Sequence, residues 1–136
     1  MIERQTIFTW PIRIYYEDTD VSGVVYHANY LRYFERARTE WLRALGLSQE
    51  TLRVDHGIAF TVANLEIDFV SPARLDDQLD VTVELTSRKR ASLIFGQTLR
   101  RPDAPERVLA RVTARVGCVD VANFRPRALP EGLILA

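Results

Sequence analysis

Apolar side chains recur every three or four residues in the stretch that follows Asn29. This spacing is typical of a helix with one buried face, and it predicts a helix from about residue 28 or 29 to Leu45. Asn29 is a possible N-cap, although His27 could begin the helix instead, and Gly46 is the expected stop. The face expected to be buried consists of Tyr30, Leu31, Phe34, Ala37, Trp41, Leu42 and Leu45.

Most of the remaining chain alternates between apolar and polar positions, as strands with one buried face do. One strand is expected before the helix and four after it, with a short helix capped by Ser48 between them. The alternation changes phase near Ala63 and Asn64, which indicates a β-bulge or a sharp bend. The expected strands cover residues 8–16, 58 to about 71, 79–85, 92–101 and 108–118, and the tail after Asp120 has no predicted element.

This order of elements predicts an α+β fold, in which one helix lies across one curved antiparallel sheet. The helix has too few helical neighbours to bury its apolar face in any other way. A chain of 136 residues is long enough for a core of its own, and we expect residues 1–136 to form a single domain. Because long apolar strands at an open sheet edge tend to pair with another chain, a homodimer that continues the sheet is expected.

The composition narrows the class of protein. Equal numbers of basic and acidic residues, 18 of each, argue against nucleic-acid binding by bulk charge. The single cysteine excludes an intrachain disulfide framework and fits a reducing compartment. Neither a secretory signal nor a run of about 18 apolar residues that could span a membrane is visible. We therefore expect a cytoplasmic protein.

Two chemically active side chains, Asp20 and His27, stand at or just before the start of the expected helix. The first helical turn carries unpaired N–H groups and the positive end of the dipole, which can stabilise an oxyanion growing on a carbonyl. A nearby carboxylate can attack that carbonyl or activate a water. Thioesters suit such a site, because their carbonyls are electrophilic and thiolates leave readily. No metal is needed, and neither an HExxH motif nor a Cys/His metal-ligand spacing is present.

The segment Tyr15–Asp20, followed by Gly23–Tyr30, resembles the hotdog-fold acyl-CoA thioesterases of the 4-hydroxybenzoyl-CoA thioesterase superfamily. The likeness is closest to the Tol–Pal-associated (YbgC-type) branch. It implies a five-stranded antiparallel sheet wrapped around one long central helix, in dimers with two active sites at the interface that often assemble into tetramers. It implies no cofactor. The resemblance continues through residues 35–40, 71–77 and 125–130, and so covers nearly the whole chain.

The resemblance also implies roles for individual residues. Asp20 matches the catalytic nucleophile or base, and the backbone N–H and side chain of His27 match the group that polarises the thioester carbonyl. Tyr16 matches an accessory residue. Cations that hold the nucleotide end of coenzyme A match the turn formed by Arg88, Lys89 and Arg90.

Each of these residues has a competing structural interpretation. Asp20 is also a common type of turn residue, and His27 alone is more often a packed or partly exposed histidine. Tyr16 shares strand parity with Ile12 and Ile14, so it could simply pack in the core. The three cations suit phosphate groups but could form only a solvated turn. Three other residues are expected to have no catalytic role: Asp18 as a structural residue, His56 in a loop, and Cys118 in the core.

The sequence thus predicts an acyl-CoA thioesterase that releases a carboxylic acid and free coenzyme A. A hotdog dehydratase acting on hydroxyacyl thioesters is one alternative. A non-catalytic protein that binds acyl thioesters, with acyl carrier protein as its partner, is the other. The length and type of the acyl chain are not predicted.

Overall fold

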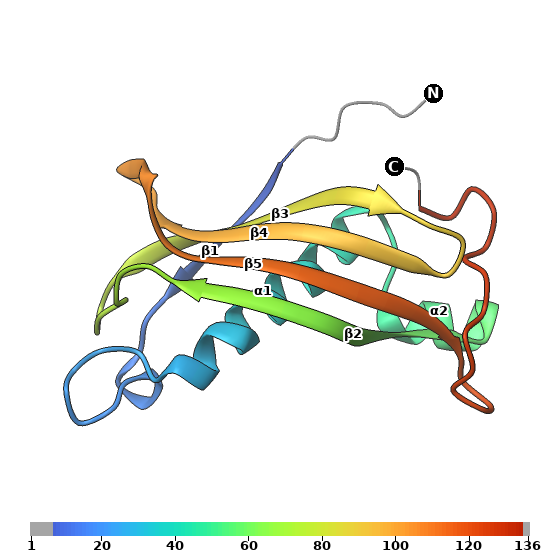
Figure 1. Cartoon of the computed structure of the whole chain (residues 1–136), viewed down its shortest axis with the longest axis horizontal. Helices are drawn as coiled ribbons and strands as arrows, with labels where there is room; N and C mark the ends of the chain where they lie inside the picture. Colours follow the sequence, from blue (N-terminus) through green and yellow to red (C-terminus); the bar gives the residue numbers. More distant parts are fainter. Residues whose placement is uncertain (1–6, 135–136) are drawn as a thin grey trace.

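The computed structural model describes residues 7–134. Five strands and two α-helices make up this part of the chain (Figure 1). They are β1 (Phe8–Arg13), the short 3₁₀ helix η1 (Tyr16–Asp18), α1 (His27–Ala44), α2 (Gln49–His56), β2 (Ile58–Phe69), β3 (Gln78–Arg88), β4 (Ser92–Arg101) and β5 (Ala104–Asp120).

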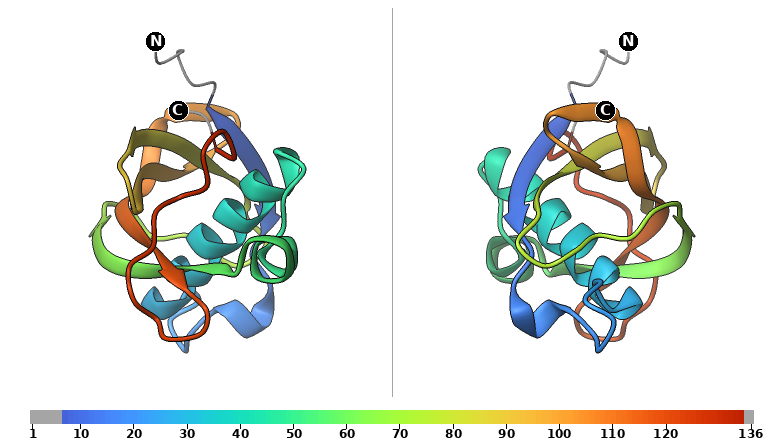
Figure 2. Two further views of the ribbon diagram at one scale, coloured as in Figure 1. Left: turned by 90° about the vertical axis from the view of Figure 1, so that its right-hand side faces the viewer. Right: turned by 90° about the vertical axis from the view of Figure 1, so that its left-hand side faces the viewer.

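The strands form one antiparallel sheet in the order β1-β3-β4-β5-β2, so the described chain leaves β1 and β2 as its two edges. The sheet curves around α1, which lies along its concave face (Figure 2). The predicted α+β architecture, with a helix across a curved antiparallel sheet, is confirmed. None of the described helices is long and apolar enough to cross a membrane.

The apolar stripe of α1 forms the centre of the core, as its spacing predicts. Two of the expected members, Leu31 and Leu45, are instead 42% and 50% exposed. Leu45 lies beyond the last helical turn, and Leu31 faces a cavity described below. Tyr33 was not expected in the core and is buried. The buried residues of α1 are Tyr30, Tyr33, Phe34, Ala37, Trp41 and Leu42.

The first strand is shorter than its sequence pattern predicts. It ends at Arg13, because the Asp18 carboxylate accepts a hydrogen bond of 2.8 Å from the Tyr15 N–H and turns the chain into η1. This local side-chain bond competes with continuation of the strand. Tyr16 consequently lies in the turn and is 82% exposed, so the interpretation of Tyr16 as a core residue is wrong.

Of the two positions expected for the start of α1, the structure has the one at His27 and not the one capped by Asn29. The helix begins at His27, with Tyr26 at the N-cap position, and Asn29 lies inside its first turn. The Asn29 side-chain amide donates to the Asp18 carbonyl at 2.9 Å, so it ties the helix to η1 rather than capping it. Gly46 follows the helix in the left-handed conformation, with φ of 83°, which confirms the predicted stop.

Two further local predictions are confirmed. The register of β2 against β5 shifts between Val62 and Asn64, which is the bulge indicated by the change of phase. The short helix after Gly46 is α2, and its N-cap is Ser48. His56 is the last residue of α2, so its assignment to a loop is wrong by one residue.

Replacing the cap of α2 should lower stability by a small, measurable amount. The Ser48 hydroxyl accepts a hydrogen bond of 3.0 Å from the Thr51 N–H, which would otherwise lack a helical partner. We expect Ser48→Ala to reduce the free energy of unfolding by about 1 kcal/mol, measured by urea denaturation, and Ser48→Asp to retain most of it. Equal losses in both variants would contradict the capping role.

Candidate active site

A tight loop between η1 and α1 holds Asp20. Thr19 and Val25 form an isolated antiparallel bridge, and the Asp20 N–H donates to the Val24 carbonyl at 2.9 Å. The Gly23 N–H donates to the Asp20 carbonyl at 3.1 Å. Gly23 has a φ of 82°, a backbone conformation that favours glycine. A further bond, from the Val25 N–H to the Ala73 carbonyl in the connection between β2 and β3, fixes the loop against the rest of the domain.

The Asp20 carboxylate is exposed and is held by its own loop. It accepts hydrogen bonds from the Ser22 N–H, at 2.8 Å, and from the Ser22 hydroxyl. The hydroxyl first, and then the N–H, hold the pKa of the Asp20 carboxyl below its usual value, because both stabilise the charged form. Asp20 is therefore an ionised, preoriented carboxylate at neutral pH.

His27 is the first residue of α1, and its side chain is exposed. Its ring lies 4.5 Å from the Tyr26 ring and 6.4 Å, edge-on, from the ring of Phe69 at the end of β2. Within residues 7–134 the His27 N–H has no hydrogen-bond acceptor. This N–H stands at the positive end of the helix dipole, where a carbonyl oxygen or an oxyanion is a favourable partner.

The loop geometry places Asp20 and His27 in the same region. Residues 19 and 25 pair across the loop, and the Tyr26 N–H donates to the Asp18 carbonyl at 3.0 Å, so the two sides of the loop run together up to the helix start. Tyr16 is in the same region, in the adjoining turn. Its proposed accessory role stays a prediction.

The basic turn lies at the other end of the sheet. It joins β3 to β4, whereas the N-terminus of α1 lies near the opposite ends of these strands (Figure 1). The Arg90 carbonyl accepts the Leu129 N–H at 2.8 Å, so the C-terminal segment packs against the turn, while the Lys89 and Arg90 side chains are exposed. Within one chain the structure does not bring Arg88, Lys89 and Arg90 to Asp20 and His27.

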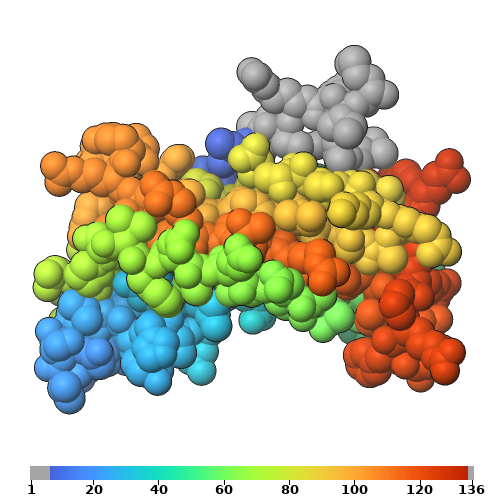
Figure 3. Space-filling view, in the orientation of Figure 1, coloured from blue at the N-terminus to red at the C-terminus, as the bar shows by residue number. Residues whose placement is uncertain are grey.

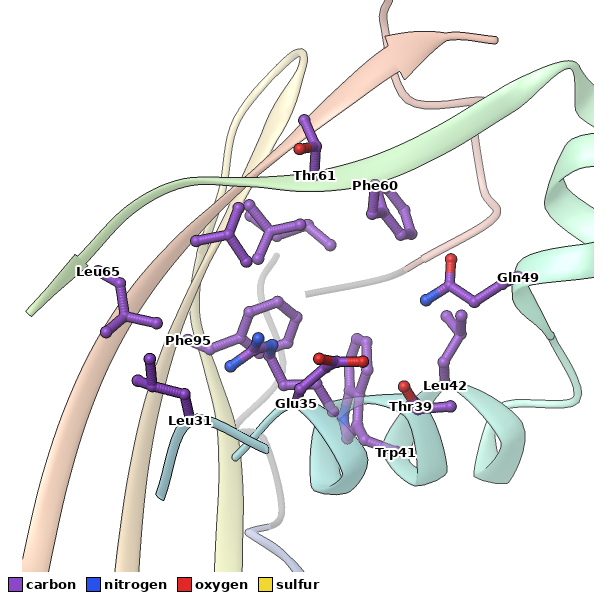
Figure 4. Close-up of a pocket in the computed structure, with 14 residues that line it drawn as sticks. Leu31, Glu35, Thr39, Trp41, Leu42, Gln49, Phe60, Thr61, Leu65 and Phe95 are labelled. Carbon is purple, nitrogen blue, oxygen red and sulfur yellow. The ribbon is translucent and has the colours of Figure 1, made fainter. Parts of the chain in front are cut away.

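A cavity of about 640 Å³ lies between α1 and the strands β2, β4 and β5. It begins at Leu31, one helical turn beyond His27, and neither His27 nor Asp20 lines it. Figure 4 shows Leu31 and Leu65 at one end of it and Leu42 and Phe60 at the other. The complete lining is Leu31, Glu35, Arg38, Thr39, Trp41, Leu42, Gln49, Phe60, Thr61, Val62, Leu65, Leu93, Phe95 and Val116.

One polar residue of this lining, and the buried side chain that binds it, did not emerge from the sequence reasoning. Arg38 lines the cavity, and its Nη1 donates to the Gln97 side-chain oxygen at 2.8 Å. Gln97 is 2% exposed and occupies an inward position of β4 between Phe95 and Leu99. A polar side chain at an inward position of an alternating strand was the signal that could have identified it.

Other side chains capable of chemistry lie apart from this region. Cys118 is 1% exposed, and burial raises the pKa of its thiol, which agrees with the predicted core position and disfavours the reactive thiolate. In the part of the chain that the structure describes, no three histidine, cysteine or acidic side chains are grouped so that they could hold a metal ion.

Comparison with known proteins relates this geometry to a family. The family model described as the thioesterase-like superfamily matches residues 15–135. The acyl-CoA thioester hydrolase YbgC of Escherichia coli O6:H1 is 45% identical over 129 residues, which cover 95% of this chain and 94% of that protein. The acyl-CoA thioesterase YbgC of Haemophilus influenzae is 47% identical over 124 residues, 91% of this chain and 89% of that protein.

A solved structure shows the same fold. The probable thioesterase from Bartonella henselae superposes with a TM-score of 0.84 at 32% sequence identity, over 92% of this chain and all of that one. The hotdog fold implied by the resemblance is thereby confirmed. With a family match over most of its length and relatives above 40% identity, this chain belongs to the thioesterase-like superfamily.

Proposed function

We propose that this thioester hydrolase cleaves acyl-CoA thioesters, with Asp20 as the catalytic carboxylate. The observation that carries the proposal is an ionised Asp20, held by Ser22 on a fixed loop, beside a helix start whose His27 N–H has no acceptor among residues 7–134. The names of the two YbgC relatives describe the same reaction for those proteins.

Two routes use these groups. In one, an Asp20 oxygen attacks the thioester carbonyl, coenzyme A leaves as its thiolate, and water hydrolyses the resulting mixed anhydride. In the other, Asp20 takes a proton from a water, whose oxygen attacks the carbonyl and expels the thiolate. In both routes the negative charge on the carbonyl oxygen grows beside the His27 N–H and the positive end of α1, which stabilise it.

The active form is proposed to be a homodimer, or a homotetramer built from such dimers. β2 is a sheet edge twelve residues long, and its side chains line the surface of the molecule (Figure 3). It exposes Val62, Phe69 and the following Val70 to about half of their full areas. An exposed apolar edge of this kind is normally paired or covered.

Pairing of β2 with β2 of a second copy would also complete the site. In antiparallel pairing about a two-fold axis the two strands run side by side in opposite directions, so one end of each sheet lies beside the other end of its partner's sheet. The basic turn of one protomer then lies at the same end of the joined sheet as His27 of its partner. We propose that Arg88, Lys89 and Arg90 act there, on the phosphates of a coenzyme A bound at the partner's helix.

The wider setting of the reaction is also a proposal. We propose that residues 1–136 act as a single domain in the cytoplasm, in association with the Tol–Pal system as the resemblance to that branch implies. Acyl carrier protein is a second possible carrier of the acyl group. Neither proposal affects the chemistry assigned to Asp20.

A panel of acyl-CoA thioesters tests the reaction directly. The purified protein should release coenzyme A from at least one short aliphatic, long aliphatic or aromatic acyl-CoA, followed with a thiol reagent. Hydration of crotonyl-CoA without thiol release would instead identify a dehydratase. Tight binding of acyl carrier protein with no release from any substrate would identify a non-catalytic partner.

The acid limb of the pH profile should respond to Ser22. Because the pKa of Asp20 is lowered in the folded protein, its carboxylate persists on acidification and kcat/KM should fall only as the pH drops through that lowered pKa. Ser22→Ala removes the hydroxyl and should raise the pKa, so the acid limb moves to higher pH. Thr9→Ala, which removes an exposed hydroxyl on the edge strand β1, is the control. An unmoved limb in Ser22→Ala would contradict the assignment of that limb to Asp20.

A further inference from the structure

The cavity continues the helix face on which His27 stands. Leu31, Glu35 and Leu42 lie four, eight and fifteen residues after His27, so they share its face of α1. All three line the cavity, which therefore runs along this face. The opposite wall follows β2, from Leu65 to Phe60, in the direction that leads away from the His27–Phe69 contact. This cavity therefore offers an apolar path to an acyl group whose carbonyl lies at His27.

The walls of that path are mainly hydrocarbon and aromatic. Trp41 and Phe95 meet edge to face at 5.0 Å, and most of the other lining side chains are aliphatic or aromatic. The polar members of the lining are Glu35, Arg38, Thr39, Gln49 and Thr61, and of these Arg38 carries the positive charge. It is partly buried, and burial lowers its pKa from the usual arginine range, although a guanidinium remains protonated.

A buried amide holds Arg38 in place. The Gln97 side-chain oxygen accepts from Arg38 Nη1 at 2.8 Å, while its nitrogen donates to the Phe34 carbonyl at 3.0 Å. Since both ends of the amide are engaged, a flipped amide would point its donors at Arg38 and its oxygen at a carbonyl, and both bonds would be lost. Gln97 thus orients a charged group at an apolar cavity.

Within residues 7–134 of one chain, hydrogen-bonding partners for the remaining Arg38 donors are absent: Gln97 is the side chain that binds its guanidinium. A guanidinium carries five N–H groups, and the bond to Gln97 uses one of them. Among the residues that the structure describes, no carboxylate oxygen lies within 4.0 Å of this guanidinium; Glu35 acts on it only from farther away. A partly buried cation with free donors favours an oxygen acceptor on whatever fills the cavity.

We propose that Arg38 selects acyl groups that carry a hydrogen-bond-accepting oxygen at the end remote from the thioester. This inference rests on the proposed hydrolysis of acyl-CoA and names the substrate class of that site. The oxygen belongs to a terminal hydroxyl or to a terminal carboxylate, and both present the same acceptor to the guanidinium.

The position of Arg38 sets the matching chain length. Residue 38 is about 16 Å along the helix axis from residue 27, at 1.5 Å per residue. Side chains on a helix lean back toward its N-terminus, so the guanidinium is nearer to His27 than its Cα is. An extended chain of on the order of ten bonds, at about 1.2 Å each, spans the interval.

Matched substrates test the selection. In the wild-type protein, kcat/KM for ω-hydroxydecanoyl-CoA, or for the CoA monothioester of decanedioic acid, should exceed that for decanoyl-CoA by on the order of 10- to 100-fold. Arg38→Met keeps an unbranched apolar stem and removes the donors, so the preference should vanish or reverse. Arg38→Lys should retain a reduced preference and covers the case in which the Met variant does not fold. Arg32→Met, an exposed arginine of α1 outside the cavity lining, is the control.

A binding measurement separates this inference from the proposed reaction. S-decyl-CoA and S-(ω-hydroxydecyl)-CoA are thioethers that cannot be hydrolysed, and their affinities are compared by calorimetry. If the hydroxylated thioether binds more tightly and the difference depends on Arg38, the selection holds even without turnover of any acyl-CoA. If acyl-CoAs are hydrolysed but the preference is absent, or is unchanged in Arg38→Met, the selection is refuted while the reaction stands.

Discussion

Asp20→Asn should lower kcat for acyl-CoA hydrolysis by about 10³-fold or more, with fold and oligomeric state unchanged. The amide is almost the same size as the carboxylate, but it can neither attack a carbonyl nor accept a proton from water. Asp20 is exposed and its contacts are confined to its own loop, so the substitution removes no core packing. The measurement is thiol release at saturating substrate, with circular dichroism as the check on folding.

The matched control is Asp103→Asn, in the exposed turn between β4 and β5. It removes the same charge at a site remote from α1 and should leave kcat unchanged. Wild-type thioester hydrolysis by Asp20→Asn would remove Asp20 from the mechanism. A folded variant that still binds the non-hydrolysable S-decyl-CoA without turning over its thioester counterpart would place the defect in the chemical step.

Ala63→Lys should weaken the proposed dimer by on the order of 100-fold and reduce hydrolysis with it. Ala63 is exposed in the middle of β2, at the bulge. Antiparallel pairing of two β2 strands would bring both copies of residue 63 close to the two-fold axis. Two lysines facing one another there should cost about 3 kcal/mol of association free energy, because like charges repel and lose hydration. Sedimentation equilibrium measures the dissociation constant.

Thr9→Lys provides the comparison, because Thr9 is an exposed residue of β1, the other edge of the sheet. It introduces the same charge on a different edge and should leave both dimer and activity intact. Dissociation by Thr9→Lys but not by Ala63→Lys would move the interface to β1. Full activity of a monomeric Ala63→Lys variant would show that one chain contains the whole site.

Local sequence patterns predict much of this fold. The stripe from Tyr30 to Leu42 identifies the central helix, since only a 3.6-residue period brings these side chains to one face. The phase change at Ala63 identifies the bulge, and Ser48 and Gly46 identify helix ends through cap and left-handed geometry. Each signal depends on the backbone within a few residues, so the sequence is sufficient to read it.

Strand and helix periodicity fails where another interaction overrides it. Tyr16 has the parity of a core residue, yet it lies in a turn because the Asp18 carboxylate captures the Tyr15 N–H and ends the strand early. Leu31 has the spacing of a core residue, yet it faces the cavity rather than close-packed neighbours. Periodicity assigns a residue to one face of a helix or strand. Only the packed structure decides whether that face contacts other side chains, a cavity or solvent.

By itself, the sequence determined the α+β class and the central helix, because these rest on residue types and short spacings. The family came from the resemblance of its motifs, and that resemblance also marked Asp20 and His27 as the candidate pair. The tertiary structure alone decided that the basic turn lies at the opposite end of the sheet from His27, and that Arg38 meets Gln97 at the cavity. Residues 38 and 97 are 59 positions apart, and their contact exists only because the sheet curves around α1 and presents an inward side chain of β4 to the helix.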